Sequence, residues 1–205
     1  MEYMATQPDN AFDLAIVDPP YGIDVAAVGT VGGNNCAEAK NYGAKDWDTS
    51  PPTKEYFAEL RRVSKNQIIW GANHFISNLA IDSSCWIVWD KNNSGNFADC
   101  ELSWTSFDTA VRKFTFTWNG MIQGNMKNKE TRIHPTQKPV ALYKWLLQNY
   151  AEKGQRILDT HLGSASSAIA AHYFGCDFVG CEIDKEYYDA ARARFKRETR
   201  QLAMF

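Results

Sequence analysis

An acid, two prolines and an aromatic ring end an apolar run near the start of the sequence, in the segment DLAIVDPPYG at residues 13–22. Pro19 and Pro20 restrict the backbone after Asp18, so that a carboxylate and an adjacent carbonyl can face one site. Such paired acceptors match the two hydrogens of an exocyclic amine and shift its delocalised lone pair toward the nitrogen. Tyr21 adds a flat face for stacking a ring. The segment predicts activation of an aromatic amine, although Asp-Pro and Pro-Pro also favour a simple turn.

A second segment, residues 156–184, has the residue order of a nucleoside-binding half-site. An apolar run ends at Asp159, a turn of small residues containing Gly163 follows, and a helical stretch and a second apolar run lead to Glu182. An acid about 20 residues after such a turn is spaced to bind ribose hydroxyls. The single glycine gives little support for a pyrophosphate, so a cofactor with ribose and an amino-acid tail fits better. A tight connection with a capping serine is the structural alternative.

Strand and helix patterns alternate along the chain. The expected strands are 13–18, 67–72, 85–90, 101–107, 113–118, 156–161 and 177–183, and the expected helices are 53–64, 138–154, 164–175 and 185–202. This alternation predicts an α/β fold with a mostly parallel sheet and helices on both faces. Gly154 and Gly175 are expected as C-terminal caps, and the basic run 191–200 as the outer face of the last helix.

The composition predicts one globular domain over residues 1–205. The chain is 44% hydrophobic with a formal net charge of -2, so any polyanion must be met by a local patch. Long irregular stretches at 22–50 and 95–133 are expected to be a flexible loop and a small insertion for target recognition. Five cysteines, mostly in apolar runs, favour reduced thiols and no metal site. No leader and no membrane span are expected.

Three motifs together resemble those of the S-adenosylmethionine-dependent DNA amino methyltransferases: DPPYG at 18–22, HPTQKP at 134–139, and the segment from ILDTHLGS to FVGCEID at 157–184. The motif order, with DPPY first and the cofactor turn last, looks like the β class, and the sequence resembles small phage or prophage adenine methylases. The resemblance implies a Rossmann-like methyltransferase fold with circularly permuted motifs. It also implies an edge strand that would fall upstream of Met1, so we expect a sheet without it.

The same resemblance assigns roles by position. Asp18 and the Pro19 carbonyl would accept hydrogen bonds from the target amine, Pro20 would complete the motif, and Tyr21 would stack on the flipped base. The cofactor would lie against Asp159, Thr160, His161, Gly163, Ser164, Ala165, Glu182 and Asp184, and on its other side against His134, Thr136, Gln137 and Lys138. Lys138 is expected to meet the cofactor's carboxylate, while both histidines could equally be structural.

The cofactor turn departs from the family pattern D-P-F-x-G-S-G. His161 replaces the aromatic residue, and Ala165 replaces the second glycine. A Cβ at position 165 would crowd the cofactor or strain a backbone that needs a positive φ. A degenerate methylase that binds DNA or a partner without turnover is therefore the alternative from another functional class.

A local excess of positive charge predicts where DNA is contacted. Residues 110–138 carry six basic residues against one acid, and Arg112, Lys113, Lys127, Lys129 and Arg132 are the expected DNA-binding residues. The expected reaction is methylation of adenine N6 in double-stranded DNA after base flipping, in the cytoplasm of a bacterial or phage-infected cell. By resemblance, Asp18 favours adenine over cytosine N4, where Ser is more usual, and over protein glutamine, where Asn is usual. RNA is a neighbouring alternative substrate, and a homodimer is a candidate assembly.

Overall fold

The computed structural model describes residues 1–24, 30–31, 40–41, 43, 45, 47–93, 98–119 and 122–200. Its helices are α1 Glu2–Ala5, α2 Lys54–Val63, α3 Ile76–Leu79, α4 Val140–Tyr150, α5 Ser166–Phe174 and α6 Lys185–Glu198, with a 3₁₀ turn η1 at Ala72–His74. The strands of the main sheet are β1 Phe12–Val17, β4 Ser64–Trp70, β5 Trp86–Asp90, β6 Cys100–Thr105, β7 Arg112–Thr115, β10 Arg156–Asp159 and β11 Asp177–Gly180. Two short hairpins pair β2 Thr30–Val31 with β3 Lys40–Asn41, and β8 Trp118–Asn119 with β9 Ile122–Gln123.

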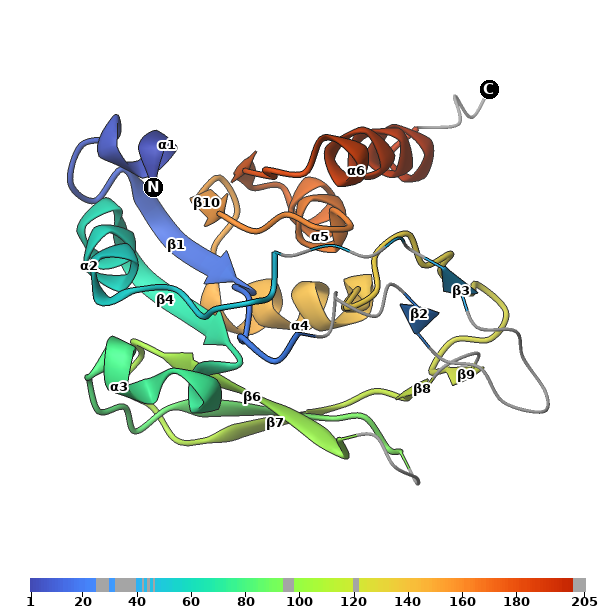
Figure 1. Ribbon diagram of the computed structural model, residues 1–205, viewed down its shortest axis with the longest axis horizontal. Coiled ribbons are helices and arrows are strands. Elements are labelled where there is room, and N and C mark those ends of the chain that lie inside the picture. Colours follow the sequence, from blue (N-terminus) through green and yellow to red (C-terminus); the bar gives the residue numbers. More distant parts are fainter. Residues whose placement is uncertain are drawn as a thin grey trace.

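The main sheet has the strand order β11-β10-β1-β4-β6-β5-β7 (Figure 1). β11, β10, β1 and β4 pair in parallel, β6 runs antiparallel to both of its neighbours, and β5 pairs in parallel with β7. The predicted mostly parallel α/β sheet is therefore confirmed. From β1 the chain continues outward to β4, whereas from β10 it continues to β11 on the other side. The strand order thus reverses between β1 and β10, which is where ligands collect in open α/β sheets.

Alternate side chains of β1 serve two separate cores. Leu14 and Ile16 belong to one core with residues of α4 and α5, whereas Ala15 and Val17 belong to another with residues of α1, α2 and α3. This period of two is that of a strand buried on both faces. α6 packs beside α5. Because α4 and α5 belong to one core and α1, α2 and α3 to the other, helices cover both faces of the sheet as predicted (Figure 1).

Two of the expected boundaries differ from the structure. The strands expected at 101–107 and 113–118 are confirmed as β6 and β7 of the main sheet, so this part of the stretch 95–133, also expected to be a recognition insertion, belongs to the sheet. Gly175 has φ +89 and caps α5 as predicted, but Gly154 does not cap α4, which ends at Tyr150 with Ala151 as its cap. Gly154 instead forms a turn with φ +82 and donates to the Gly175 carbonyl.

β11 is one edge of the sheet, since within the described ranges no strand pairs with its outer side. Much of the loop expected at 22–50 lies outside the described residues, so that prediction is not tested there. In the parts of the chain that the structure covers, no helix is long and apolar enough to span a bilayer.

Candidate active site

The DPPYG segment forms a rigid elbow after β1. Asp48, whose side chain is buried, accepts hydrogen bonds from the backbone N–H groups of Tyr21 at 2.8 Å and Gly22 at 3.0 Å. Gly22 has φ +71, and a Cβ there would lie 2.6 Å from Cδ of Pro51. Only glycine therefore fits this turn without displacing its neighbour. The elbow fixes Asp18 at the carboxyl end of β1, beside the point where the strand order reverses.

Asp18 belongs to a chain of ion pairs that sequence reasoning did not predict. The Lys138 ammonium lies 2.6 Å from Oδ2 of Asp18 and 3.0 Å from Oε2 of Glu101. Lys91 lies 2.5 Å from the other oxygen of Glu101. Lys138 is only 4% exposed, so this ammonium is committed to two carboxylates. Lys138, which the resemblance places near the cofactor's carboxylate, contacts Asp18, Glu101 and Tyr21 in the structure.

The Tyr21 hydroxyl is also bound inside this cluster. It donates to Oδ1 of Asp18 at 2.9 Å and accepts from Lys138 at 3.2 Å. The ring of Tyr21 stacks on His74, with centroids 4.9 Å apart and planes 14° apart. A Cβ on Gly71 would lie 2.0 Å from the Tyr21 ring, so glycine is required at that position. The structure therefore holds the predicted stacking ring tightly, with one face of the ring against His74.

Burial and charge oppose one another at these acids. Burial raises the pKa of Asp18, and Lys138 opposes the shift. At Glu101 burial also favours the neutral acid, but Lys138 and Lys91 outweigh it and lower the pKa to about 2. The pKa of Lys138 is raised because its two carboxylates outweigh the effect of burial. Glu101 is thus an anion and Lys138 a cation at neutral pH.

The turn after β10 is built on two acids. Asp159 is buried and accepts from Ser167 Oγ at 2.6 Å and from the His161 N–H at 2.9 Å. Glu182 accepts from the N–H groups of Gly163 at 2.8 Å and Asp184 at 3.0 Å, one on each oxygen. Each carboxylate oxygen of Glu182 keeps a further lone pair, so it can also accept from ribose hydroxyls.

Several of the expected cofactor residues have structural partners. Thr160 Oγ1 lies 2.7 Å from the Tyr56 hydroxyl and 3.0 Å from Nδ1 of His161. Burial lowers the pKa of His161 to about 4, so its ring is neutral. Asp184 caps α6 by accepting from two backbone N–H groups, and it pairs with Lys45 at 2.9 Å. Asp184 therefore positions the start of α6.

The HPTQKP segment lies against the cofactor turn. His134 is the nearest side chain to the Cβ position of Gly163, and it packs edge-on against Tyr187 with centroids 4.3 Å apart. Thr136 Oγ1 lies 3.1 Å from Nδ1 of His134. Burial lowers the pKa of His134 to about 4. His134 thus lies beside the turn as a neutral ring, and Thr136 contacts His134.

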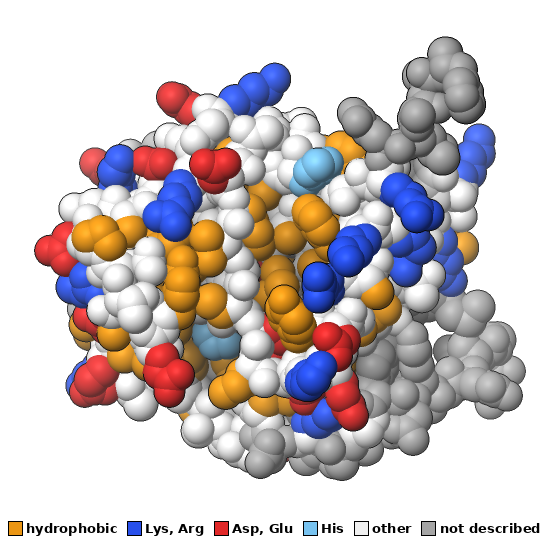
Figure 2. Space-filling model, turned by 90° about the horizontal axis from the view of Figure 1, so that it is seen from above, with side chains coloured by type: hydrophobic (Ala, Val, Ile, Leu, Met, Phe, Trp, Pro, Cys, Tyr) orange, Lys and Arg blue, Asp and Glu red, His pale blue; other side chains and the backbone are white. Residues whose placement is uncertain are grey.

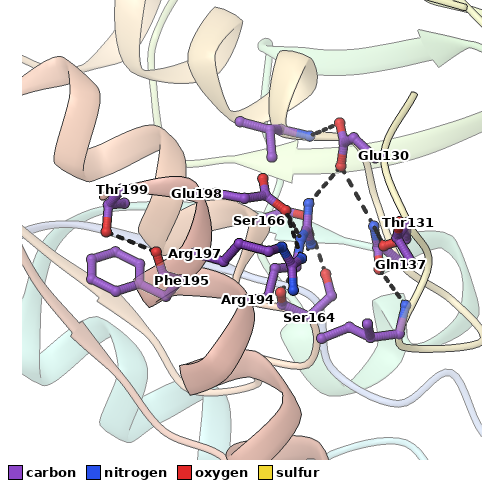
Figure 3. Close-up of polar contacts among 12 residues, drawn as sticks. Glu130, Thr131, Gln137, Ser164, Ser166, Arg194, Phe195, Arg197, Glu198 and Thr199 are labelled. Carbon is purple, nitrogen blue, oxygen red and sulfur yellow. Dashed lines mark hydrogen bonds and ion pairs between the residues drawn. The ribbon is translucent and has the colours of Figure 1, made fainter. Parts of the chain in front are cut away.

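Gln137 and Ser164 are tied into a buried polar network rather than left open to a ligand (Figure 3). The side-chain oxygen of Gln137 accepts from the Ile133 N–H at 2.9 Å, and the backbone carbonyl of Gln137 accepts from the Trp118 indole N–H at 2.8 Å. The Ser164 carbonyl accepts from Arg194 at 2.9 Å. These contacts hold the ends of the two motifs in place.

Ala165 adopts a left-handed backbone conformation, which is strained for a residue that has a Cβ. Its φ is +62 and it is buried beside Ala168 and Ala191. Ala165→Gly is expected to stabilise the fold by roughly 0.5 kcal/mol, because relief of about 1–2 kcal/mol of strain exceeds the loss of one buried methyl worth about 0.8 kcal/mol. Ala168→Gly, inside α5, should destabilise it by about 1 kcal/mol. Equal signs for the two variants in urea unfolding would contradict this assignment.

The raised pKa of Asp159 predicts that the free energy of unfolding depends on pH. Burial raises its pKa from 3.8 to about 7, despite the bonds from Ser167 and His161. The folded protein therefore binds a proton more tightly than the unfolded chain, so the free energy of unfolding should fall as pH rises from about 4 to about 7. Asp159→Asn should remove this part of the slope in urea unfolding measured across that range. A variant with the same slope as the parent chain would show that Asp159 is not the group responsible.

The expected DNA-binding residues divide into two groups. Arg112, Lys113, Lys127 and Lys129 are exposed. Arg132 is half-buried, with its guanidinium 4.5 Å from the centroid of the Trp118 ring. Lys113 also pairs with Asp90 at 3.2 Å. Figure 2 views the molecule from above Figure 1, the side on which α6 lies, and shows Lys and Arg side chains on one flank of a central strip of hydrophobic side chains.

In comparisons with known proteins, the chain matches DNA methylases and methyltransferases. The family model described as DNA methylase matches residues 104–193. The chain is 23% identical to the type II methyltransferase M2.DpnII of Streptococcus pneumoniae, over 96% of this chain and 87% of that protein. A solved complex of M1.HpyAVI with S-adenosylmethionine is 23% identical, with a TM-score of 0.56 over 94% of this chain and 91% of the other. The PvuII cytosine-N4-specific DNA methyltransferase is 12% identical, with a TM-score of 0.60 over 95% of this chain and 83% of the other.

Proposed function

We propose that this chain, which belongs with the DNA methylases, transfers a methyl group from S-adenosylmethionine to N6 of adenine in double-stranded DNA. The observation that supports it most is the position of Asp18. Its carboxylate lies in a buried cluster at the carboxyl end of β1, next to the turn after β10 and at the reversal of strand order. Asp159 ends β10, the strand that pairs with β1, so both acids lie at the carboxyl ends of neighbouring parallel strands.

The residues around Glu182 and the turn after β10 fit the proposed cofactor. Glu182 has acceptor capacity for ribose hydroxyls, and Gly163, Ser164 and Ala165 have side chains small enough to leave room for the amino-acid portion. S-adenosylmethionine supplies an electrophilic methyl group on a sulfonium. A cofactor without phosphate suits a turn that has one glycine and, at Ala165, a Cβ.

The chain's own groups would supply orientation and electrostatics. Asp18 accepts from an N–H of the target amine, which moves the lone pair toward the nitrogen that attacks the methyl carbon. Tyr21 stacks on the flipped base and offsets part of the few kcal/mol that flipping costs. Transfer is one in-line displacement, so no covalent nucleophile is needed. The nitrogen then loses one proton, and the acceptor beside it is Asp18.

The fold alone does not determine the target base, since the PvuII enzyme with a similar fold is cytosine-N4-specific. By its family resemblance, Asp18 favours adenine. We assign DNA contact to Arg112, Lys113, Lys127, Lys129 and Arg132, and place the reaction in the cytoplasm of a bacterial or phage-infected cell, where DNA and the cofactor occur. A homodimer remains a candidate assembly.

The test is incubation of the protein with methyl-labelled cofactor and duplex DNA, followed by nucleoside analysis. N6-methyladenine supports the proposal, and N4-methylcytosine would reassign the target base. Calorimetry separates the alternative of a binding module, because DNA binding without detectable cofactor binding would favour that module and overturn the proposal. Base-resolution mapping of methylated DNA would then give the recognised sequence.

A further inference from the structure

We propose that Glu101 is a positioning residue for this reaction: by sharing the Lys138 ammonium with Asp18, it leaves Asp18 enough negative charge to accept from the target amine. The inference rests on the proposed function, because it concerns how strongly Asp18 draws on the amine. Glu101 itself touches Lys138, Lys91 and Tyr21, and it would act on Asp18 through Lys138.

The geometry places two carboxylates on one ammonium. Lys138 is 2.6 Å from Oδ2 of Asp18 and 3.0 Å from Oε2 of Glu101, which puts the acids within about 6 Å of each other. A buried lysine paired with Asp18 alone would neutralise it and make it a weak acceptor. Glu101 divides that positive charge between two anions. Lys91, 2.5 Å from the far oxygen of Glu101, keeps Glu101 ionised so that the division persists.

The charged and titratable groups that face Asp18 come from several elements. Tyr21, on the same segment, donates to it. Lys138 comes from the segment before α4, and Glu101 from β6. Tyr143 on α4 and Asp159 on β10 interact with it electrostatically. Within the described residues, the pKa of Asp18 is raised by burial and by Glu101, and it is lowered by Lys138 and by the hydrogen bond from Tyr21.

Two substitutions should move the pKa of Asp18 in opposite directions. Glu101→Gln keeps the shape but removes an anion, so the pKa of Asp18 should fall. Lys138→Met removes the cation, so that pKa should rise, each by on the order of one unit. Both are measured on the free protein by ¹³C NMR titration of the Asp18 carboxyl carbon. Glu101→Asp, which restores the charge, should bring the titration back toward the parent curve.

Kinetics give the second readout. Glu101→Gln should lower kcat for methylation roughly 10-fold or more with little change in cofactor affinity, because the weakened acceptor acts after binding. Glu59→Gln is the matched control, since it replaces an acid paired with Arg62 on α2 outside the site, and it should leave kcat unchanged.

The outcomes separate the two proposals. Opposite shifts of the Asp18 pKa, with a kcat loss in Glu101→Gln that Glu101→Asp partly restores, support the inference. Unchanged pKa values, shifts of the same sign, or a kcat equal to that of the parent chain in Glu101→Gln would overturn it. A parent protein that methylates no adenine defeats the proposed function instead, while the NMR titration still decides whether Glu101 tunes Asp18.

Discussion

Asp18→Asn should lower kcat for adenine methylation by about 10²- to 10³-fold, the usual consequence of removing one group that stabilises developing charge. The asparagine keeps the size and one oxygen of the aspartate. It loses the negative charge, and its amide nitrogen can only donate where the amine needs an acceptor. Lys138 would retain Glu101 as its partner, so the cluster should stay folded.

The measurement is single-turnover methylation of duplex DNA with saturating cofactor. Asp13→Asn is the matched control, because Asp13 lies at the opposite end of β1, pairs with Lys65 at 2.7 Å and accepts from the Arg156 N–H. It should lower stability slightly and leave the rate of transfer intact. Calorimetry should give Asp18→Asn the parent affinity for the cofactor. Comparable rates for the two variants would remove Asp18 from the chemistry.

The sheet and the location of the site could be predicted from local sequence. Apolar runs bounded by Gly, Asn, Asp or Pro gave the seven main strands, and β1 and β10 each lead directly into a motif. Parallel strands place such motifs at one edge of the sheet, so Asp18 and the turn after Asp159 had to meet. The left-handed backbone at Ala165 is one of the two outcomes expected from the family pattern, which has glycine there.

The partners of these residues could not be predicted in the same way. Asp18, Glu101 and Lys138 come from three distant segments, and nothing in the residues beside Lys138 shows that its ammonium turns toward two acids. The one available signal was Glu101 itself, an acid entering the apolar strand pattern ELSWTSF. An ionisable group at such a position requires a partner. Similarly, nothing local in the sequence identifies Asp48 as the acceptor that fixes the elbow.

Arg194 corrects a different expectation. The basic run 191–200 was expected to be an exposed helix face, yet Arg194 is fully buried while Arg197 is 59% exposed. Its guanidinium donates to the Ser164 carbonyl and the Ser166 hydroxyl, both at 2.9 Å, and pairs with Glu130 at 2.6 Å and Glu198 at 3.0 Å (Figure 3). Glu130 in turn accepts from the Val140 N–H at the start of α4. One side chain thus joins α6, the cofactor turn and the segment before α4.

Arg194→Met should therefore lower the free energy of unfolding by roughly 3–5 kcal/mol, because it removes a fully buried cation and leaves the half-buried Glu130 without its partner. The melting temperature should fall by roughly 10 °C. Adding Glu130→Gln to Arg194→Met should recover part of the loss, since the amide oxygen can still accept from Val140 and no charge is stranded. Arg197→Met is the control: its pair with Glu198 is exposed, so it should change stability by less than about 0.5 kcal/mol. If urea unfolding gives Arg194→Met and Arg197→Met the same stability, the buried network does not hold the cofactor turn to α6.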